Sequence, residues 1–316
     1  MKKLLIVSLL LTMFGMVVKA EVKVSGFVQV QLVNDESLVG KELYATCKRA
    51  RIIAKGDMGD KVELFAQLET LTKEVNLLDL VIEYNLGTFG KIGLGRFCIP
   101  VGLQNSVSPY NLHTINYAQV VQKLVGSGAR DFGIRWTGKY SVIDWNLACI
   151  NGADGSTTVS NDKEDNDVKD IALRVGVSIP MISGLGIGVS AYDGKAGATK
   201  TEKKRLGADL KYEKDPVYLQ GEYISGKDGE TEKSGMYVEL GYKIGGLQPI
   251  ARYEVYDGDT KVEDSTEITI TAIGINYYIG KNSKIQLIYE MKKDKLGASL
   301  SDIKNDVMIA QVAAKF

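Results

Sequence analysis

The feature that most constrains the fold of this chain is an alternation of apolar and polar residues from residue 22 to the C-terminus. In the first segment, Val22, Val24 and Val28 share one parity, whereas Lys23 and Gln29 have the other. Successive side chains of a β-strand point to opposite faces of its sheet. Each such segment therefore has one apolar and one polar face, and the chain is predicted to be a β protein.

The first twenty residues have the pattern of a cleavable export signal. Lys2 and Lys3 precede an apolar run over residues 4–18, and the small residue Ala20 stands at the expected cleavage position. This run is shorter than the roughly 20 apolar residues that a membrane-spanning helix needs. The pattern of the remaining chain never changes character. We therefore predict a signal peptide over residues 1–20 and one mature domain over residues 21–316.

The C-terminal segment indicates where an exported chain of this kind folds. Met308, Ala310, Val312 and Ala314 form one small or apolar row that ends at Phe316. A last strand that ends at an aromatic residue resembles the assembly signal of bacterial outer-membrane barrels. No later stretch is apolar enough for a transmembrane helix. The sequence predicts an all-β fold, a transmembrane antiparallel up-and-down β-barrel of about 16 strands, even-numbered as in bacterial single-chain barrels.

Turn-forming residues divide the chain into strands joined by connections of two kinds. Short turns are predicted at residues 56–60, 85–90, 137–139, 180–184, 213–216, 245–246 and 280–283. Longer charged connections are predicted at residues 151–167, 193–201, 225–233, 257–265 and 292–305. Outer-membrane barrels have short periplasmic turns and longer extracellular loops, so this alternation favours such a barrel.

One long connection differs from the others. Residues 100–129 contain no Asp or Glu, are rich in apolar residues, and carry Lys123 as their only formal charge. A large barrel leaves an aqueous channel that an inserted element can narrow, and long loops usually have a function. We expect this third loop to fold into the lumen and to place Tyr110, His113, Tyr117 and Lys123 at a constriction. A loop that caps the outside or packs on a neighbouring subunit is the alternative.

Charged residues fall on the polar faces of the predicted strands. The basic residues expected to line the pore are Arg49, Arg51, Arg135, Arg174, Arg205, Lys211 and Arg252. Acidic residues share these faces, so most of the charges are interpreted as pairs that hold a polar wall. A constriction without carboxylates opposite arginines favours anions, because selectivity follows the sign of the lining charge.

Composition argues against several other classes of protein. The precursor has 39 basic and 39 acidic residues, so no nucleic-acid partner is expected. Its three cysteines exclude a full disulfide framework, and no cluster has zinc spacing, so no metal or cofactor is expected. His113 is the only histidine, and no Gly-x-Ser-x-Gly motif accompanies it. A membrane-bound hydrolase that depends on His113 is an alternative from a different class of protein.

Two short motifs carry a resemblance to a known family. Residues 48–52 read Lys-Arg-Ala-Arg-Ile, and residues 95–102 read Gly-Arg-Phe-Cys-Ile-Pro-Val-Gly. They resemble the Arg-rich strand opening and the Gly-x-Phe-x-x-Pro-x-Gly start of the third loop in the phosphate-selective porin O and P family of Gram-negative outer membranes. The resemblance implies a sixteen-stranded trimeric channel that passes anions, with Arg49 and Arg51 in the lumen. Phosphate-binding members carry basic residues on a loop where this chain has only Lys123.

Together these features predict an outer-membrane diffusion porin of a Gram-negative type of bacterium. We expect a homotrimer in outer-membrane lipid that passes small hydrophilic solutes, prefers anions and catalyses no reaction. Two alternatives stay open: a channel specific for phosphate or another oxyanion, and a structural barrel plugged by residues 100–129.

Overall fold

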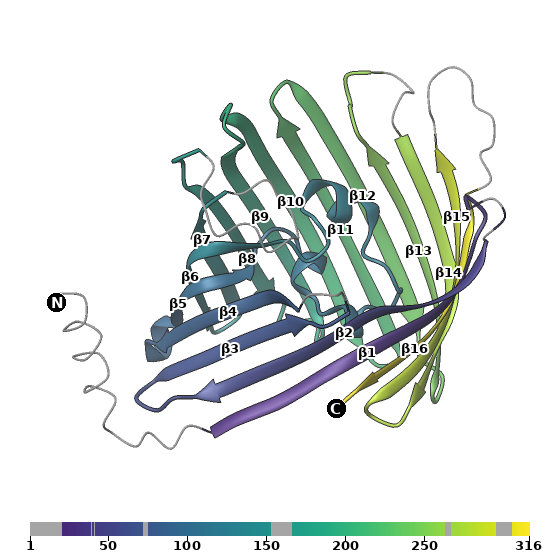
Figure 1. The fold of residues 1–316 in the computed structure, drawn as a ribbon, viewed down its shortest axis with the longest axis horizontal. Coiled ribbons are helices and arrows are strands. Elements are labelled where there is room, and N and C mark those ends of the chain that lie inside the picture. The colour runs from purple at the N-terminus through teal and green to yellow at the C-terminus, as the bar shows by residue number, and fades with distance from the viewer. Residues whose placement is uncertain are drawn as a thin grey trace.

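Sixteen strands form one closed antiparallel barrel, in which β1 pairs with both β2 and β16 (Figure 1). The structure is a computed structural model, and it describes residues 21–38, 40, 42–71, 75–152, 166–262, 267–294 and 305–316. Every strand pairs with its neighbours in sequence, so the predicted up-and-down barrel is confirmed. The predicted signal peptide, residues 1–20, lies outside the described residues.

The strand boundaries place the short turns at one end of the barrel and the remaining connections at the other. The strands are β1 (Glu21–Asp35), β2 (Leu43–Asp57), β3 (Val62–Glu69), β4 (Asn76–Asn85), β5 (Lys91–Cys98), β6 (Arg130–Tyr140), β7 (Ile143–Ile150), β8 (Asp170–Ser178), β9 (Leu185–Ala196), β10 (Thr201–Lys214), β11 (Val217–Asp228), β12 (Thr231–Tyr242), β13 (Leu247–Asp257), β14 (Glu267–Ile279), β15 (Ser283–Asp294) and β16 (Val307–Lys315). The helical elements are η1 (Gly87–Phe89), η2 (Gln104–Ser106), η3 (Pro109–Asn111) and α2 (Gln119–Leu124). No helix in the described ranges is long and apolar enough to cross a membrane.

The barrel is apolar on its outside and polar on its inside. On β1, Val28, Val30 and Leu32 are exposed, whereas Gln29 and Gln31 are buried. Exposed Leu, Ile and Val side chains alternate in the same way with buried Gln, Glu and Arg on most other strands. A water-soluble protein buries its large apolar side chains, so this outer face requires a hydrocarbon environment.

One predicted turn is wrong because Gly138 has a packing role and not a turn-forming one. Residues 137–139 belong to β6, and the chain turns instead at residues 141–142, where Ser141 has a φ of 53°. Gly138 serves packing: a Cβ atom at this position would lie 2.3 Å from the ring of Trp145 on β7. The glycine therefore makes room for an aromatic side chain on the neighbouring strand.

One predicted long loop is also wrong. Residues 225–233 continue β11 and β12 up to a two-residue connection at residues 229–230, where Gly229 has a φ of 62°. The charges that suggested a loop pair across the hairpin, since Lys233 Nζ lies 2.8 Å from an oxygen of Asp228. Opposite charges on adjacent strands stabilise pairing, so these two strands extend further than hydropathy suggests.

The barrel closes between its first and last strands. The backbone N–H of Phe316 donates to the carbonyl of Gly26 at 3.0 Å. The N–H of Gly26 donates to the carbonyl of Phe316 at 3.1 Å. A Cβ at residue 26 would lie 2.6 Å from the Phe316 ring. Glycine on β1 thus lets the C-terminal aromatic ring lie across the closing seam.

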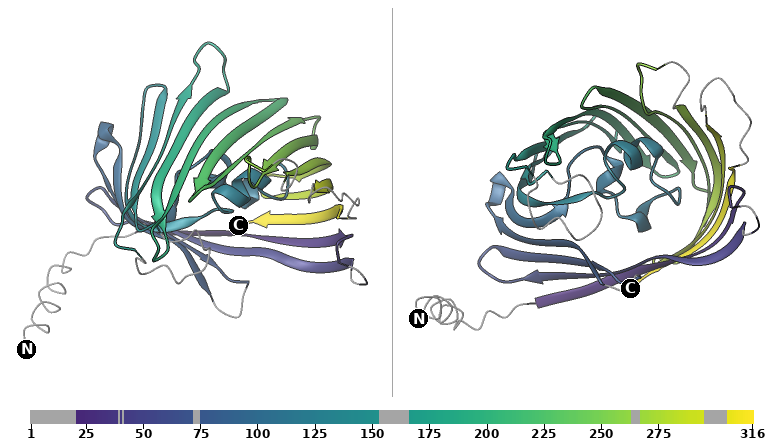
Figure 2. Two further views of the ribbon diagram at one scale, coloured as in Figure 1. Left: turned by 90° about the horizontal axis from the view of Figure 1, so that it is seen from above. Right: turned by 45° about the horizontal axis from the view of Figure 1, so that its top comes forward.

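Residues 99–129, called the inserted loop below, lie within the ring of strands (Figure 2). Its α2 helix packs against β11, β12 and β13. Val120, Val121 and Leu124 of this helix are buried in a cluster that includes Ile224 and Tyr237 of the wall. The interior therefore holds a small apolar core inside an otherwise polar barrel.

Candidate functional site

The inserted loop begins at a glycine that approaches the wall closely. Gly102 has a φ of 74°, and a Cβ there would lie 2.0 Å from Glu222 Oε1. Its N–H donates to Ser190 Oγ at 3.0 Å. The next two backbone N–H groups, of Leu103 and Gln104, donate to Glu222 at 2.9 and 3.2 Å. One buried carboxylate of β11 therefore fixes the path on which the chain enters the lumen.

A second set of contacts holds the middle of the inserted loop. Thr114 Oγ1 donates to Glu239 Oε2 at 2.8 Å, and Arg252 Nη1 donates to the carbonyl of Asn116 at 2.7 Å. Arg252 is 2% exposed and pairs with Glu254 at 3.1 Å and with Glu239 at 3.6 Å. The guanidinium thus neutralises two buried carboxylates and binds the loop at the same time.

Four carboxylates of the wall accept hydrogen bonds from the inserted loop, which has no carboxylate of its own. Gln119 N–H donates to Glu254 at 2.5 Å, and Asn116 Nδ2 donates to Glu290 at 3.0 Å. The complete set of accepting carboxylates is Glu222, Glu239, Glu254 and Glu290. Hydrogen bonds to an ionised carboxylate are roughly twice as strong as those between neutral groups. The negative charges of this wall are therefore directed at the loop.

The tip of the inserted loop is held by side chains from both sides of the barrel seam. Gln29 Nε2 of β1 donates to the carbonyl of Pro109 at 3.2 Å. Lys284 Nζ of β15 donates to the carbonyl of Leu112 at 2.7 Å. The tip is thereby fixed close to the junction of β1, β15 and β16.

His113 is packed into the wall. Its ring lies 3.7 Å from the ring of Tyr218, and a 3.0 Å hydrogen bond joins its Nδ1 to Gln248 Oε1. Burial lowers the pKa of His113 below its ordinary value. In the described part of the chain no serine hydroxyl bonds to this ring.

Tyr110, Tyr117 and Lys123, the other residues predicted at the constriction, lie in different surroundings. The Tyr117 hydroxyl donates to the carbonyl of Val107 at 2.7 Å, and burial raises the pKa of Tyr117 to about 12. Tyr110 lies under the ammonium groups of two wall lysines. Lys123 is exposed at the end of α2, far along the loop from the tip. The loop therefore brings Tyr110 and His113 to one cavity and leaves Lys123 outside it.

Six of the seven cations predicted to line the pore are in ion pairs. The pairs are Arg51–Glu69, Arg135–Glu83, Arg174–Asp209, Arg205–Asp228, Lys211–Glu213 and Arg252–Glu254, at 2.9, 2.7, 2.6, 2.7, 2.6 and 3.1 Å. Arg205 and Arg252 are buried under the inserted loop, and Arg205 Nε donates to the carbonyl of Leu124 at 2.6 Å. These two side chains anchor the loop and contribute little charge to open lumen.

Arg49 is the exception among these seven cations. Its Nη1 donates to the neutral Gln29 Oε1 at 3.1 Å, and it forms no ion pair with a described carboxylate. Together with Arg51 and Arg130, it lies close enough to Tyr117 to influence that hydroxyl electrostatically. The wall that faces the inserted loop from β2 therefore carries a positive charge without a described counterion.

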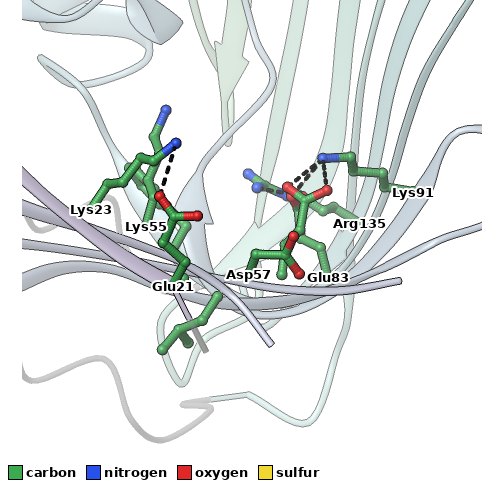
Figure 3. Close-up of a pocket in the computed structure, with 11 residues that line it drawn as sticks. Glu21, Lys23, Lys55, Asp57, Glu83, Lys91 and Arg135 are labelled. Carbon is green, nitrogen blue, oxygen red and sulfur yellow. Dashed lines mark hydrogen bonds and ion pairs between the residues drawn. The ribbon is translucent and has the colours of Figure 1, made fainter. Parts of the chain in front are cut away.

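Two cavities of about 500 Å³ lie towards the short-turn end, and their charges differ. The first, drawn in Figure 3, is balanced, with Lys91–Glu63 at 2.7 Å and Lys23–Glu21 at 3.4 Å among its pairs. The second lies beneath the loop tip, between β10, β11 and β14–β16. Its charged lining residues are Lys211, Lys281, Lys284, Lys315 and Glu213. The second cavity therefore has a clear excess of positive charge.

Sequence reasoning missed the anchors and the second cavity. The alternation places acidic residues on the polar faces of the strands, but the loop partners of the anchoring carboxylates lie more than a hundred residues away in sequence. The loop's own composition offered one signal, since a buried segment rich in Asn, Gln and Thr must find acceptors elsewhere. Within the described ranges, no group of His, Cys, Asp or Glu side chains could hold a metal ion, and all three cysteines are free.

The barrel, its apolar outside and its lumen loop define a β-barrel channel of the outer membrane. A family model described as Gram-negative porin matches residues 8–297, and the chain belongs to this family. It is therefore an outer-membrane porin. The matching family is not the phosphate-selective porin O and P family that the two short motifs resemble. A search of curated protein sequences finds no match.

Solved porin structures share this fold at low sequence identity. OmpF of Salmonella typhi, in a complex with daunomycin, is 14% identical, with a TM-score of 0.67 over 93% of this chain and 97% of its own. A trimer form of OmpT, an outer membrane protein of Vibrio cholerae, is 12% identical, with a TM-score of 0.66 over 94% and 99%. A mutant porin of Rh. blastica is 14% identical, with a TM-score of 0.58 over 94% and 100%. At this identity the likeness establishes the fold alone.

Proposed function

We propose that this porin is a general diffusion channel that prefers anions. One observation carries the proposal. The inserted loop has no carboxylate, the four wall carboxylates beside it are taken up by its hydrogen bonds, and Arg49 on the facing wall pairs with no described carboxylate. The four carboxylates are directed at the loop, and three of them also pair with Arg252 or Lys292, whereas Arg49 presents a positive charge without a described ion-pair partner.

The mechanism is passive. Hydrated solutes enter the water-filled lumen, pass the inserted loop and leave without a chemical step. A close ion pair acts on a distant solute only as a dipole, so the paired side chains of the wall hold its shape and contribute little selectivity. A cation without an ion-pair partner, such as Arg49, attracts chloride or carboxylates that come within about 8–10 Å of it at physiological ionic strength.

Assembly and export are part of the same proposal. Residues 1–20 have the composition of a signal peptide and lie outside the described residues. The trimer form of the structurally similar OmpT supports a homotrimer in outer-membrane lipid. The exposed apolar outer face supplies surface for contact with both lipid and neighbouring barrels.

Reversal potential in planar bilayers tests the anion preference. In a KCl gradient the purified channel is expected to select chloride. Arg49→Gln is expected to reduce this preference, whereas Arg49→Lys retains the charge and serves as the matched control. Cation preference of the unmodified channel contradicts the proposal, and negligible conductance favours the alternative of a plugged structural barrel.

A further inference from the structure

We propose that the cavity beneath the loop tip binds an organic polyanion, a small molecule with two or three carboxylates, as it passes through the pore. This cavity, the lysine pocket, is lined by Lys211, Lys281, Lys284 and Lys315. The proposal rests on the anion preference argued above and adds the class of solute and the place where it binds.

The lysine pocket has positive charge that the protein does not neutralise. Lys211 pairs with Glu213 at 2.6 Å. Glu213 is the one acidic residue among the described residues that line the pocket. Lys281 and Lys315 carry this charge, because neither forms an ion pair with a described carboxylate. The balanced cavity of similar volume shows the opposite arrangement, with its cations opposed by carboxylates (Figure 3). The excess charge is therefore a property of this cavity and not of the whole short-turn end.

The inserted loop holds part of this charge in place. The ammonium groups of Lys284 and Lys315 lie 5.5 and 5.1 Å from the centre of the Tyr110 ring. Lys284 is 3% exposed, and its Nζ donates to the carbonyl of Leu112 at 2.7 Å. Cation–π contacts and a buried hydrogen bond reduce the freedom of lysine side chains, which lowers the entropic cost of binding an anion.

The size of the cavity favours an organic ligand over a simple ion. Its volume is about 500 Å³, whereas one water molecule in the liquid takes up about 30 Å³. Cavities that hold small organic molecules are typically about 300–1,000 Å³. Ser108, Ser283 and the ring of Tyr278 add neutral polar and aromatic surface between the lysines. A molecule with several carboxylates on a carbon skeleton can contact separate lysines at once, which chloride cannot do.

The position of the lysine pocket predicts the side from which the ligand acts. Lys281 belongs to the short turn between β14 and β15, and Ser283 begins β15. The pocket therefore opens towards the short-turn end. A polyanion added on that side reaches it without passing the inserted loop.

Citrate block of single-channel current tests the proposal on the full mature chain in planar bilayers. Citrate added on the short-turn side is expected to block at lower concentration than citrate added on the other side. Acetate at equal ionic strength is expected to have no such effect. Loss of two attractive charges in Lys281→Gln/Lys315→Gln is expected to weaken block about 30-fold, because each contact between unit charges about 4 Å apart in water strengthens binding about fivefold. Lys23→Gln/Lys55→Gln removes the same charge from the balanced cavity and is the matched control.

Four outcomes overturn the proposal: absence of citrate block, equal block by acetate, equal weakening in both double variants, or block by inorganic phosphate but not by citrate. The last would identify a site for a compact oxyanion instead. Reversal potential measured on the same channels separates the two proposals. Chloride preference without citrate block contradicts only the proposed role of the lysine pocket. Cation preference contradicts the proposed function.

Discussion

At the residue scale, Glu222 shows how one side chain can determine the path of a loop. It is 3% exposed, and it accepts backbone hydrogen bonds from Leu103 and Gln104. Gly102 beside it has no Cβ, and a larger residue would collide with the carboxylate. The contact needs a glycine on one segment and a carboxylate 120 residues further along the sequence.

Glu222→Ala is expected to destabilise the barrel. It leaves the N–H groups of Leu103 and Gln104 without this acceptor, and hydrogen bonds to charged groups contribute about 1.5–3 kcal/mol each. Thermal unfolding in detergent, followed by circular dichroism, should show a lower midpoint. Glu222→Gln keeps one carbonyl oxygen as an acceptor at this position, so its unfolding midpoint should fall less than that of Glu222→Ala. An Ala variant with the same midpoint as the unmodified chain would show that this anchor contributes no stability.

His113 gives a pH dependence whose sign follows from its burial. Its folded-state pKa is lowered, so on acidification the unfolded chain binds a proton at this residue before the folded chain does. Its contribution to stability is therefore complete above the ordinary histidine pKa and decreases as pH falls below about 6.5. His113→Gln should reduce the loss of thermal stability between pH 7.5 and pH 5.5. Because the chain has one histidine, an unchanged loss in the variant excludes this residue as the cause.

At the element scale, the inserted loop masks the charge of the wall that it covers. Four wall carboxylates accept its hydrogen bonds, and Ile99 and Ala129 at its two ends are joined by a 2.9 Å backbone hydrogen bond. The ends are therefore already adjacent, and the barrel does not depend on the loop for closure. The loop determines which charges meet the solute.

Replacement of residues 100–128 by a short Gly-Ser linker should therefore change both conductance and selectivity. Conductance should rise because the lumen widens, and selectivity should move towards cations because Glu222, Glu239, Glu254 and Glu290 face water. Reversal potential and single-channel current measure the two effects. Mutating all four carboxylates to Gln in the same background should abolish the shift towards cations. A larger pore with unchanged selectivity would contradict the masking argument.

The strands could be predicted from the sequence more readily than the loop. Alternation is a local property, and each strand reveals its two faces within a few residues. The wrong turn at Gly138 and the wrong loop over residues 225–233 arose where glycine or charge has a packing or pairing role across strands. The anchors of the inserted loop and the lysine pocket join residues distant in sequence. Their partners depend on the closed register, which no local pattern contains.

At the scale of the whole molecule, an apolar outside and a polar inside make the fold dependent on its surroundings. The exposed side chains of β9 include Ile187 and Val189, and the buried ones include Ser190 and Tyr192. Apart from the small apolar core around the inserted loop, the inside is filled by polar residues that form hydrogen bonds and ion pairs, so most apolar side chains of the strands lie on the outer face. Stability therefore depends on hydrocarbon around the barrel, most strongly at mid-height.

A charge on the outer face should consequently cost more at mid-height than near an end. Val189, 56% exposed, lies within β9, whereas Tyr140, 68% exposed, is the last residue of β6 beside a short turn. The lysine charge in Val189→Lys should lower the free energy of unfolding by about 2–4 kcal/mol. The charge in Tyr140→Lys should lower it by about 0–1 kcal/mol. Urea unfolding of the mature chain in lipid vesicles measures both, with Val189→Ala and Tyr140→Ala as controls for lost side-chain volume. Equal costs at the two positions would show that this face does not contact lipid, because water solvates a lysine equally well at either height.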